Sequence, residues 1–340
     1  MSLPDPASDN LLYHYTSEAG LRGILESDMI WATDVRFLND DTEFQRAFNE
    51  KYLQIVIEAL RISMRKDIDS EAAPIINAML SARNYAPILE LIEKSKETND
   101  TFVCSFSRPQ GDGFDPGDRL SQWRGYSHGS QGFSLGFDPE SLEKEIAMDS
   151  STMKRSVMQC IYEDTGPDAC LFEETGRDAG LRFNDLWFRG EAVPDSFQTL
   201  NPHATVGYIK ANYYFLKALS KATAEFFTHG ARIKHIGFRE ECEWRIVVQA
   251  SHEALLRSAT LQSRTGPFGK TPFIEVPLGL SKKDPSPLRR IVVGPGKNTD
   301  KDDLKEWVER LLKTGGISVR RGRFSDGVEV SLSTIPYRAA

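Results

Sequence analysis

Alternating apolar and polar positions mark several strands along the chain, and the first of them leads directly into a helix. Residues 11–17 alternate as a short strand, and the next apolar side chains, Leu21, Ile24 and Leu25, recur at helical spacing. Thr16 or Ser17 is suited to cap that helix, because a hydroxyl can accept from the first free backbone N–H groups. The pattern therefore predicts a strand–helix unit, followed by a second strand over residues 29–37.

The same criteria predict the rest of the chain. They give a long helix over 39–66, helical structure over 70–100, strands at 101–107, 132–138 and 156–164, a short helix at 118–126, mainly helical structure over 165–229, and a strand, a helix and a strand within 289–335. No internal repeat, low-complexity tract or clear linker interrupts this order. We predict an α+β fold with a central mixed or antiparallel sheet, in which residues 1–340 form one domain with helical insertions at about 45–98 and 165–229.

Composition narrows the class of protein. The 340 residues are 40% apolar and 27% charged, and the net charge is −7, which argues against strong global attraction to nucleic acid. No apolar run reaches the length of a membrane span, and the four cysteines form no CxxC pair. We expect a cytoplasmic protein without a membrane partner.

One predicted strand carries unusual charge. In GFREECEWRIVV, residues 237–248, alternation puts Glu241, Glu243 and Arg245 on one face and the apolar side chains on the other. Two carboxylates at this spacing can work as an acid and a base, hold a ribose hydroxyl, or form ion pairs with neighbouring arginines. Ion pairing is the default for such a face, so a functional role depends on what other residues join it.

Other candidates are weaker when taken singly. His14 lies in the first strand, where a lone histidine is more often a core residue than a catalyst. Trp123 and Tyr126 share a face of the short helix, which is ordinary packing, although a planar ligand could also stack there. A capping box explains the acids that follow Asn39 but leaves Asn39 itself unexplained. Arg36 can contact a phosphate or pair with Asp34 or Glu43.

The sequence has no metal-ligand motif, and we predict no metal site. The histidines lack a spacing such as H-E-x-x-H. A hydrolase or nuclease that holds Mg²⁺ between Asp40, Glu43, Glu241 and Glu243 is a further possibility, since carboxylates suit that ion, but no spacing specifies it.

Four ordered blocks resemble a bacterial family known as domain of unknown function 2971. They are LYHYTS…LRGIL…IWATDVRFLNDDTE, VCSFS…LSQWRGYSHGSQGFSLGFD, EECEWRIV and the closing IVVGP, so the resemblance runs from Leu11 to the last strand. The family name implies no activity.

A more distant resemblance does imply one. A strand that ends in His-Tyr-Thr before a helix, together with a late E-x-E strand, is similar to NAD-dependent ADP-ribosyltransferases and their split sheet. The resemblance implies that His14 bonds an NAD ribose, that the Tyr15–Thr16 backbone holds the nicotinamide amide, and that Glu243 stabilises the sugar cation. Glu241 would then orient or deprotonate the acceptor. The aromatic residue that stacks on nicotinamide is expected soon after the second strand, where Phe37 and Phe44 are the candidates, whereas Tyr126 comes later.

The leading hypothesis is an enzyme that uses NAD as a substrate and modifies a macromolecule, protein or nucleic acid, as a toxin or antiphage effector. Its site would comprise His14, Tyr15, Thr16, Arg36, Asn39, Trp123, Tyr126, Glu241 and Glu243. The alternative is a sensor module that holds a nucleotide-like ligand in the same pocket without catalysis.

Overall fold

The structure is a computed structural model. It describes residues 10–38, 50–64, 99–108, 114–126, 131–149, 153–163, 167–198, 205–258, 261–266, 269–281, 286–295, 301–320 and 327–336, together with positions 74, 77 and 78. Asn39, Asp40, Asp41, Glu43 and Phe44 lie outside the described residues, as does most of the helical insertion predicted at 45–98.

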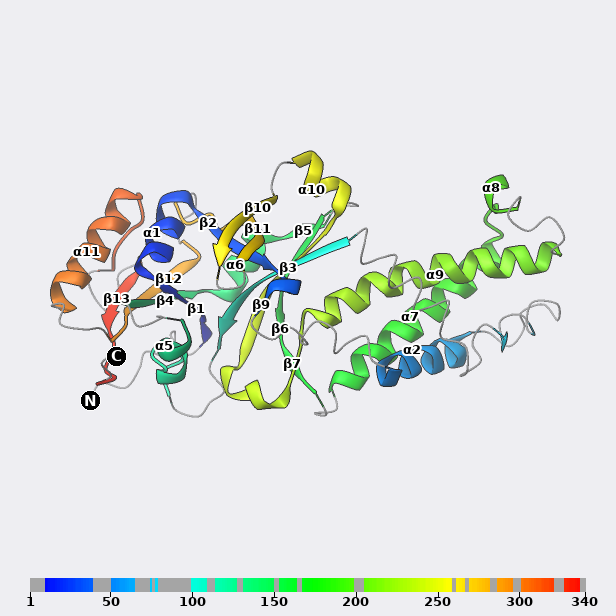
Figure 1. The fold of residues 1–340 in the computed structure, drawn as a ribbon, viewed down its shortest axis with the longest axis horizontal. Coiled ribbons are helices and arrows are strands. Elements are labelled where there is room, and N and C mark those ends of the chain that lie inside the picture. Colours follow the sequence, from blue (N-terminus) through cyan, green and yellow to red (C-terminus); the bar gives the residue numbers. More distant parts are fainter. Residues whose placement is uncertain are drawn as a thin grey trace.

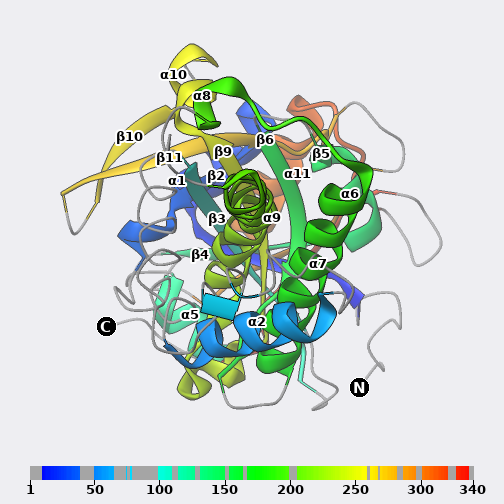
Figure 2. The same cartoon turned by 90° about the vertical axis from the view of Figure 1, so that its right-hand side faces the viewer.

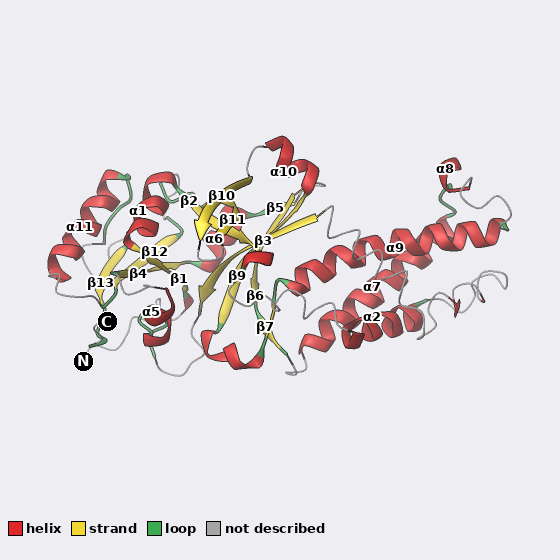
Figure 3. Cartoon of the chain, viewed as in Figure 1, coloured by secondary structure: helices red, strands yellow, loops and turns green. Residues whose placement is uncertain are grey.

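A mixed, open sheet of eleven strands forms the centre of the described part of the molecule (Figure 3). Its strands are β1 (Leu12–Ser17), β2 (Met29–Asp34), β3 (Asn99–Ser107), β4 (Gly132–Phe137), β5 (Met148–Asp149), β6 (Met153–Gln159), β9 (Glu243–Ser251), β10 (Leu261–Gly266), β11 (Gly269–Pro277), β12 (Leu288–Val293) and β13 (Glu329–Leu332). The order is β10-β11-β2-β3-β1-β4-β12-β13, while β9, β6 and β5 continue from β3. β12 and β13 pair in parallel, and the other ladders of this sheet are antiparallel.

Strand β3 is the branch point of the sheet. One of its edges pairs with β9 from Asn99 to Ser107. The other edge pairs with β2 at Phe102 and Val103 and with β1 at Ser107. Between these pairings Ser105 and its two neighbours have no ladder partner from β1 or β2 in the described chain, so the two strands form a fork along this edge of β3.

Helices lie around the sheet and in a long arm. They are α1 (Glu18–Ser27), α2 (Glu50–Ser63), α5 (Leu120–Tyr126), α6 (Pro139–Ile146), α7 (Pro167–Arg189), α8 (Asp195–Gln198), α9 (Val206–Gly230), α10 (His252–Ser258) and α11 (Lys301–Thr314), with 3-10 turns η2 (Val35–Phe37) and η4 (Ile236–Glu241). Helices α2, α7 and α9 project from the sheet as a bundle (Figures 1 and 2). A small parallel sheet of β7 (Ile161–Tyr162) and β8 (Ile233–Lys234) lies where the arm meets the body.

The two parts have separate apolar cores. The sheet core contains alternate residues of β3, namely Phe102, Cys104 and Phe106, as the alternation predicted. The arm core is rich in aromatic side chains, including Tyr214 and Phe226 of α9. Burying apolar area in this way is the main stabilising contribution to each part.

Most predicted elements are confirmed where they are described, but several boundaries differ, and residues 99–100, predicted to be helical, begin β3. The predicted strand over 29–37 ends at Asp34, and a 3-10 turn follows. The strand predicted at 156–164 is divided into β6 and β7. After α11, the strand that pairs with β12 is β13, and residues 317–319 contribute only an isolated bridge at Val319.

Candidate functional site

A cavity of about 630 Å³ lies in the fork between β1 and β2. Helix α1 covers it, β3 forms its floor, and η4, β9, α5 and the β10–β11 hairpin complete its walls. This volume lies within the usual range for small-molecule sites. The side of α1 that lines the cavity bears mostly small residues, among them Ala19, Gly20 and Gly23, which leaves space under the helix.

The cavity brings together side chains that are far apart in the sequence. Of the predicted site residues it is lined by His14, Tyr15, Thr16, Tyr126, Glu241 and Glu243. Cross-strand register explains this: Ser107 of β3 is opposite Tyr13 on one edge and Glu243 on the other. Adjacent strands lie about 4.8 Å apart, so the backbones at Tyr13 and Glu243 are separated by roughly 10 Å.

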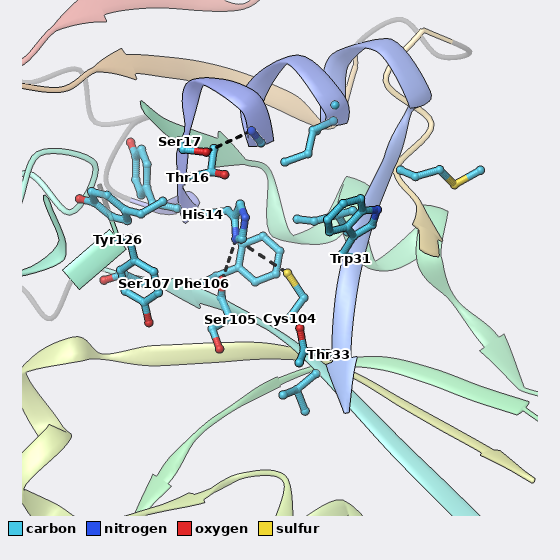
Figure 4. Close-up of a pocket in the computed structure, with 18 of the residues that line it drawn as sticks. His14, Thr16, Ser17, Trp31, Thr33, Cys104, Ser105, Phe106, Ser107 and Tyr126 are labelled. Atoms are coloured by element: carbon cyan, nitrogen blue, oxygen red, sulfur yellow. Dashed lines mark hydrogen bonds between the residues drawn. The ribbon is translucent and has the colours of Figure 1, made fainter. Parts of the chain in front are cut away.

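His14 lies in the middle of the cavity, between Trp31 and Tyr126 (Figure 4). Its Nδ1 is 3.0 Å from the carbonyl oxygen of Ser105, in the unpaired stretch of β3. A carbonyl can only accept, so Nδ1 carries the proton and Nε2 is left as an acceptor. Burial lowers the pKa of His14, which keeps the ring neutral at physiological pH.

Cys104 lies beside His14, with its Sγ 3.8 Å from Nδ1. Such a pair can suggest a thiolate nucleophile. Burial raises the pKa of this thiol, whereas a reactive cysteine needs the opposite shift. Cys104 is therefore part of the floor and of the apolar core.

Glu243 is a buried carboxylate with a cation at each oxygen. Its Oε1 accepts from Arg245 Nε at 2.6 Å, and its Oε2 accepts from Lys234 Nζ. Burial by itself would raise the pKa of Glu243, but attraction to Arg245 and Lys234 outweighs it and lowers that pKa to about 2. The result is a carboxylate fixed in orientation and ionised at neutral pH. The prediction that Arg245 pairs with a neighbouring acid is confirmed.

Glu241 does not belong to the strand, which corrects the predicted E-x-E geometry. β9 begins at Glu243, and Glu241 ends the 3-10 turn η4. Cys242 between them is left-handed, with φ 49°, so the chain turns before it enters the strand. Lys234 Nζ donates to Glu241 Oε2 at 2.8 Å and also to Glu243. The two carboxylates are therefore close because they share this lysine, and not because they alternate along one strand.

Tyr126, at the end of α5, is 37% exposed and lines the cavity. Burial of its hydroxyl raises its pKa, and the negative charges of Glu243 and Glu241 raise it further. The phenol is therefore protonated and can donate a hydrogen bond. Phe37, one of the two aromatic residues predicted after the second strand, also lines the cavity.

Two predicted residues of the described chain, Arg36 and Trp123, do not line the cavity. Arg36 is held by Asp34 and by Asp100, whose Oδ1 is 2.8 Å from Arg36 Nη2. Trp123 is buried against the ring of Tyr15, at 4.7 Å between centroids, and its Nε1 donates to Asp118. These contacts agree with the alternatives predicted for the two residues, an ion pair with Asp34 and core packing, and a part in ligand binding stays a prediction. Asn39 lies outside the described residues.

The sequence reasoning missed Lys234, Trp31 and Arg264. Trp31 is 45% exposed on β2 and lines the cavity, whereas its neighbours Ile30 and Ala32 are buried in the sheet core. A tryptophan on the polar face of an alternating strand is a signal that could have identified it. Lys234 and Arg264 carry no comparable signal, because only register and folding bring them to the site.

Two general features can be tested only on the described residues. Among them, no group of three histidine, cysteine or carboxylate side chains is placed to hold a metal ion. Asp40 and Glu43 lie outside the described residues, so the carboxylate metal site is untested. No helix in the described ranges has the length and apolar character needed to cross a membrane.

Comparison with known proteins gives a family match over part of the chain. No curated protein and no solved structure matches the chain significantly. A family model does match one segment of the chain. This segment includes Tyr126, Lys234, Glu241 and Glu243, and it ends before the β10–β11 hairpin. It is residues 122–246 that match the sequence model of the family described as "Protein of unknown function (DUF2971)".

Proposed function

We propose that the protein binds NAD in the fork cavity and transfers its ADP-ribosyl group to a macromolecule. The observation that carries the proposal is the shared cavity of His14 and Glu243, which lie 229 positions apart in the sequence. Its volume, its neutral histidine and its fixed carboxylates suit a nucleotide whose sugar becomes positively charged during reaction.

Glu243 is the group that would lower the barrier. When the bond between nicotinamide and ribose breaks, positive charge develops on the sugar, and a carboxylate already fixed nearby stabilises it without reorganising. The ion pairs with Arg245 and Lys234 supply that fixation. Glu241 shares Lys234 and would orient the acceptor.

His14 and the edge of β1 would hold the other parts of the ligand. The Nε2 of His14 can accept from a ribose hydroxyl, because Nδ1 is committed to Ser105. Beyond Tyr13, the edge of β1 that faces the fork has no strand partner in the described chain. This leaves backbone groups near Tyr15 for the nicotinamide amide. Phe37 and Tyr126 offer rings to its planar face.

The reaction is balanced as a substitution at the ribose C1′. The C1′–N bond breaks and its electron pair leaves with neutral nicotinamide. An oxygen or nitrogen of the acceptor forms the new bond to C1′, and the proton it loses passes to Glu241 or to water. No oxidant or reductant is needed.

Nicotinamide release tests the proposal. Full-length protein is incubated with NAD alone. In separate incubations it is given NAD together with a protein fraction or a nucleic acid fraction as acceptor. We expect release that falls about 100-fold or more in Glu243→Gln, in line with the loss of other electrostatic groups from active sites. Glu240→Gln is the matched control, because this exposed neighbour does not line the cavity. The proposal fails if the wild-type protein neither binds NAD nor releases nicotinamide with any fraction.

A specific observation favours the alternative of a non-catalytic nucleotide sensor. Both oxygens of Glu243 are already engaged by cations, as expected of a structural ion pair. Growth assays separate the two: toxicity on expression that Glu243→Ala relieves, while NAD binding persists, supports the enzyme. NAD binding with no release, and effects on growth that Glu243→Ala leaves unchanged, support the sensor.

A further inference from the structure

The wall of the cavity opposite Glu243 carries an arginine over an exposed tryptophan. Arg264 of β10 lies with its guanidinium carbon 5.5 Å from the ring centroid of Trp31, and the ring of Phe273 of β11 lies tilted against the same indole, with 4.3 Å between centroids. Arg264 Nη2 also donates to Thr33 Oγ1 at 3.2 Å. These side chains come from three adjacent strands of the β2–β11–β10 ladder (Figure 2).

Strand register shows that this surface belongs to one face of the sheet. Trp31 is opposite Glu275, Thr33 is opposite Phe273, and Arg264 is opposite Thr271. Side chains at alternate positions share a face, so Trp31, Thr33 and Arg264 point the same way, and all three line the cavity. The intervening residues Ile30 and Ala32 are in the sheet core.

Charge distinguishes this wall from the Glu243 end. No carboxylate of the described residues lies within ion-pair distance of Arg264, whereas Lys234 and Arg245 are both paired with acids. The positive charge of Arg264 also contributes to the lowered pKa of His14, after burial, so the two groups interact across the cavity. The cavity therefore has a Glu243 end and an Arg264–Trp31 end, and the second also includes the carboxylate of Glu275, which lies opposite Trp31 and lines the cavity.

Distance along β3 separates the two ends. Thr33, which binds Arg264, pairs with Val103, and Glu243 pairs with Ser107. Four residues of extended strand span roughly 13 Å. A single sugar or base is too short to contact both ends, whereas a ligand with two ring systems joined by phosphates can.

We infer that Arg264 and Trp31 form a subsite for the phosphate-bearing purine half of a dinucleotide, with Arg264 on phosphate and Trp31 stacked on the base. The inference rests on the proposed function, for which it names the part of the substrate held away from the reacting bond. Arginine suits phosphate because its planar donors match the phosphate oxygens, and an exposed indole suits a base because stacking tolerates any ring.

Binding measured by calorimetry on the full-length protein tests the subsite without requiring turnover. The probes are ADP-ribose, which has the phosphates, and adenosine, which lacks them. We expect Arg264→Gln to weaken ADP-ribose binding at least 10-fold and to change adenosine binding less than 2-fold. Trp31→Ala should weaken both about 10-fold, and Trp31→Phe should restore most of that loss.

Arg22→Gln is the matched control. Arg22 lies over the ring of Trp307 at 5.1 Å, in the same kind of contact as Arg264 over Trp31, but it does not line the cavity. It should leave both affinities unchanged. The inference is overturned if Arg264→Gln weakens binding of the two probes equally or does not weaken it. It is also overturned if Arg264→Gln lowers modification of the acceptor while nucleotide binding stays intact.

The outcomes also separate this inference from the proposed function. Binding of ADP-ribose that depends on Arg264, without nicotinamide release from NAD, keeps the subsite and rejects the reaction. Release from NAD that is insensitive to Arg264 keeps the reaction and rejects the subsite. Failure of both probes to bind, together with no nicotinamide release from NAD, rejects both.

Discussion

Two groups of buried carboxylates lie at opposite ends of β3, and they differ in their cations. The cavity cluster consists of Glu241, Glu243, Lys234 and Arg245. The outer cluster consists of Asp34, Asp100, Arg36 and His252. In the cavity cluster Arg245 is 3% and Lys234 8% exposed, whereas Arg36 is 56% and His252 51% exposed in the outer one.

This difference in the exposure of the basic side chains indicates which cluster is suited to chemistry. The guanidinium of Arg36 is half exposed and solvated, so its ion pairs contribute little to stability, and the outer cluster serves to fix the chain after β2. Buried cations have lost their water, so Glu243 and its partners depend strongly on one another. Only the cavity cluster borders the cavity. Arg36, for which a phosphate contact or a pair with Asp34 was predicted, is paired with Asp34 in the outer cluster.

Removing one arginine from each cluster should give the largest contrast. We expect Arg245→Met to lower the free energy of unfolding by about 3–5 kcal/mol, because it removes a buried partner of Glu243. Arg36→Met should cost about 1 kcal/mol or less, since that cation is half in water. Urea unfolding measures both. Equal costs would contradict the proposed difference between the clusters.

Acid should affect the cavity cluster in a defined direction. The folded pKa of Glu243 is lowered to about 2, below the usual value for glutamate near 4.3. Its contribution to stability is therefore complete above about pH 4.5 and is lost as pH falls towards 2, by on the order of 2 kcal/mol. Unfolding in urea between pH 6 and 2.5 should show a shallower acid slope for Glu243→Gln. An unchanged slope would contradict the assignment.

Filling the cavity should affect ligand binding and leave both clusters intact. A Cβ at Gly23 of α1 meets nothing within 4 Å, so Gly23→Leu extends into the cavity. We expect about a 10-fold loss of NAD affinity by calorimetry, with stability unchanged or raised by up to about 1 kcal/mol from better helix propensity. Gly23→Ala is the control and should retain binding. Full affinity in Gly23→Leu would place the ligand elsewhere.

The smallest expected effect concerns the phenol next to the cavity cluster. Tyr126→Phe keeps the ring and removes the hydroxyl, a hydrogen bond worth about 1 kcal/mol. We expect nicotinamide release to fall about 3- to 10-fold, with stability unchanged. Tyr208→Phe, at an exposed tyrosine on the helical arm outside the cavity, is the control. A much larger loss would indicate that Tyr126 takes part in proton transfer.

Much of the local structure could be predicted because it depends on neighbours in the sequence. Ser17 caps α1 by accepting from Gly20 N, as the hydroxyl before the helix predicted. Phe102, Cys104 and Phe106 face the sheet core as their alternation predicted. The E-x-E strand failed for a local reason too: Cys242 adopts a left-handed conformation that alternation cannot indicate.

The candidate site was partly predictable. His14 and Glu243 were chosen through a resemblance, and they do line one cavity. Trp123 packs inward on Tyr15, in agreement with the packing role that its position on the helix predicted. Lys234 and Arg264 were missed because their significance comes from side chains brought near by folding. No pattern in the neighbouring sequence marks either residue.

The sequence by itself determined several strands, among them β1, β3 and β4, the capped helix after β1, and the alternation that separates core from polar faces. These follow from spacing within single elements, where neighbours are a few residues apart. Only the tertiary structure decided that one edge of β3 lacks a partner between its pairings with β2 and β1, because strand register depends on long-range packing. That fork makes the cavity, and it joins His14, Glu243 and Arg264 into one candidate site.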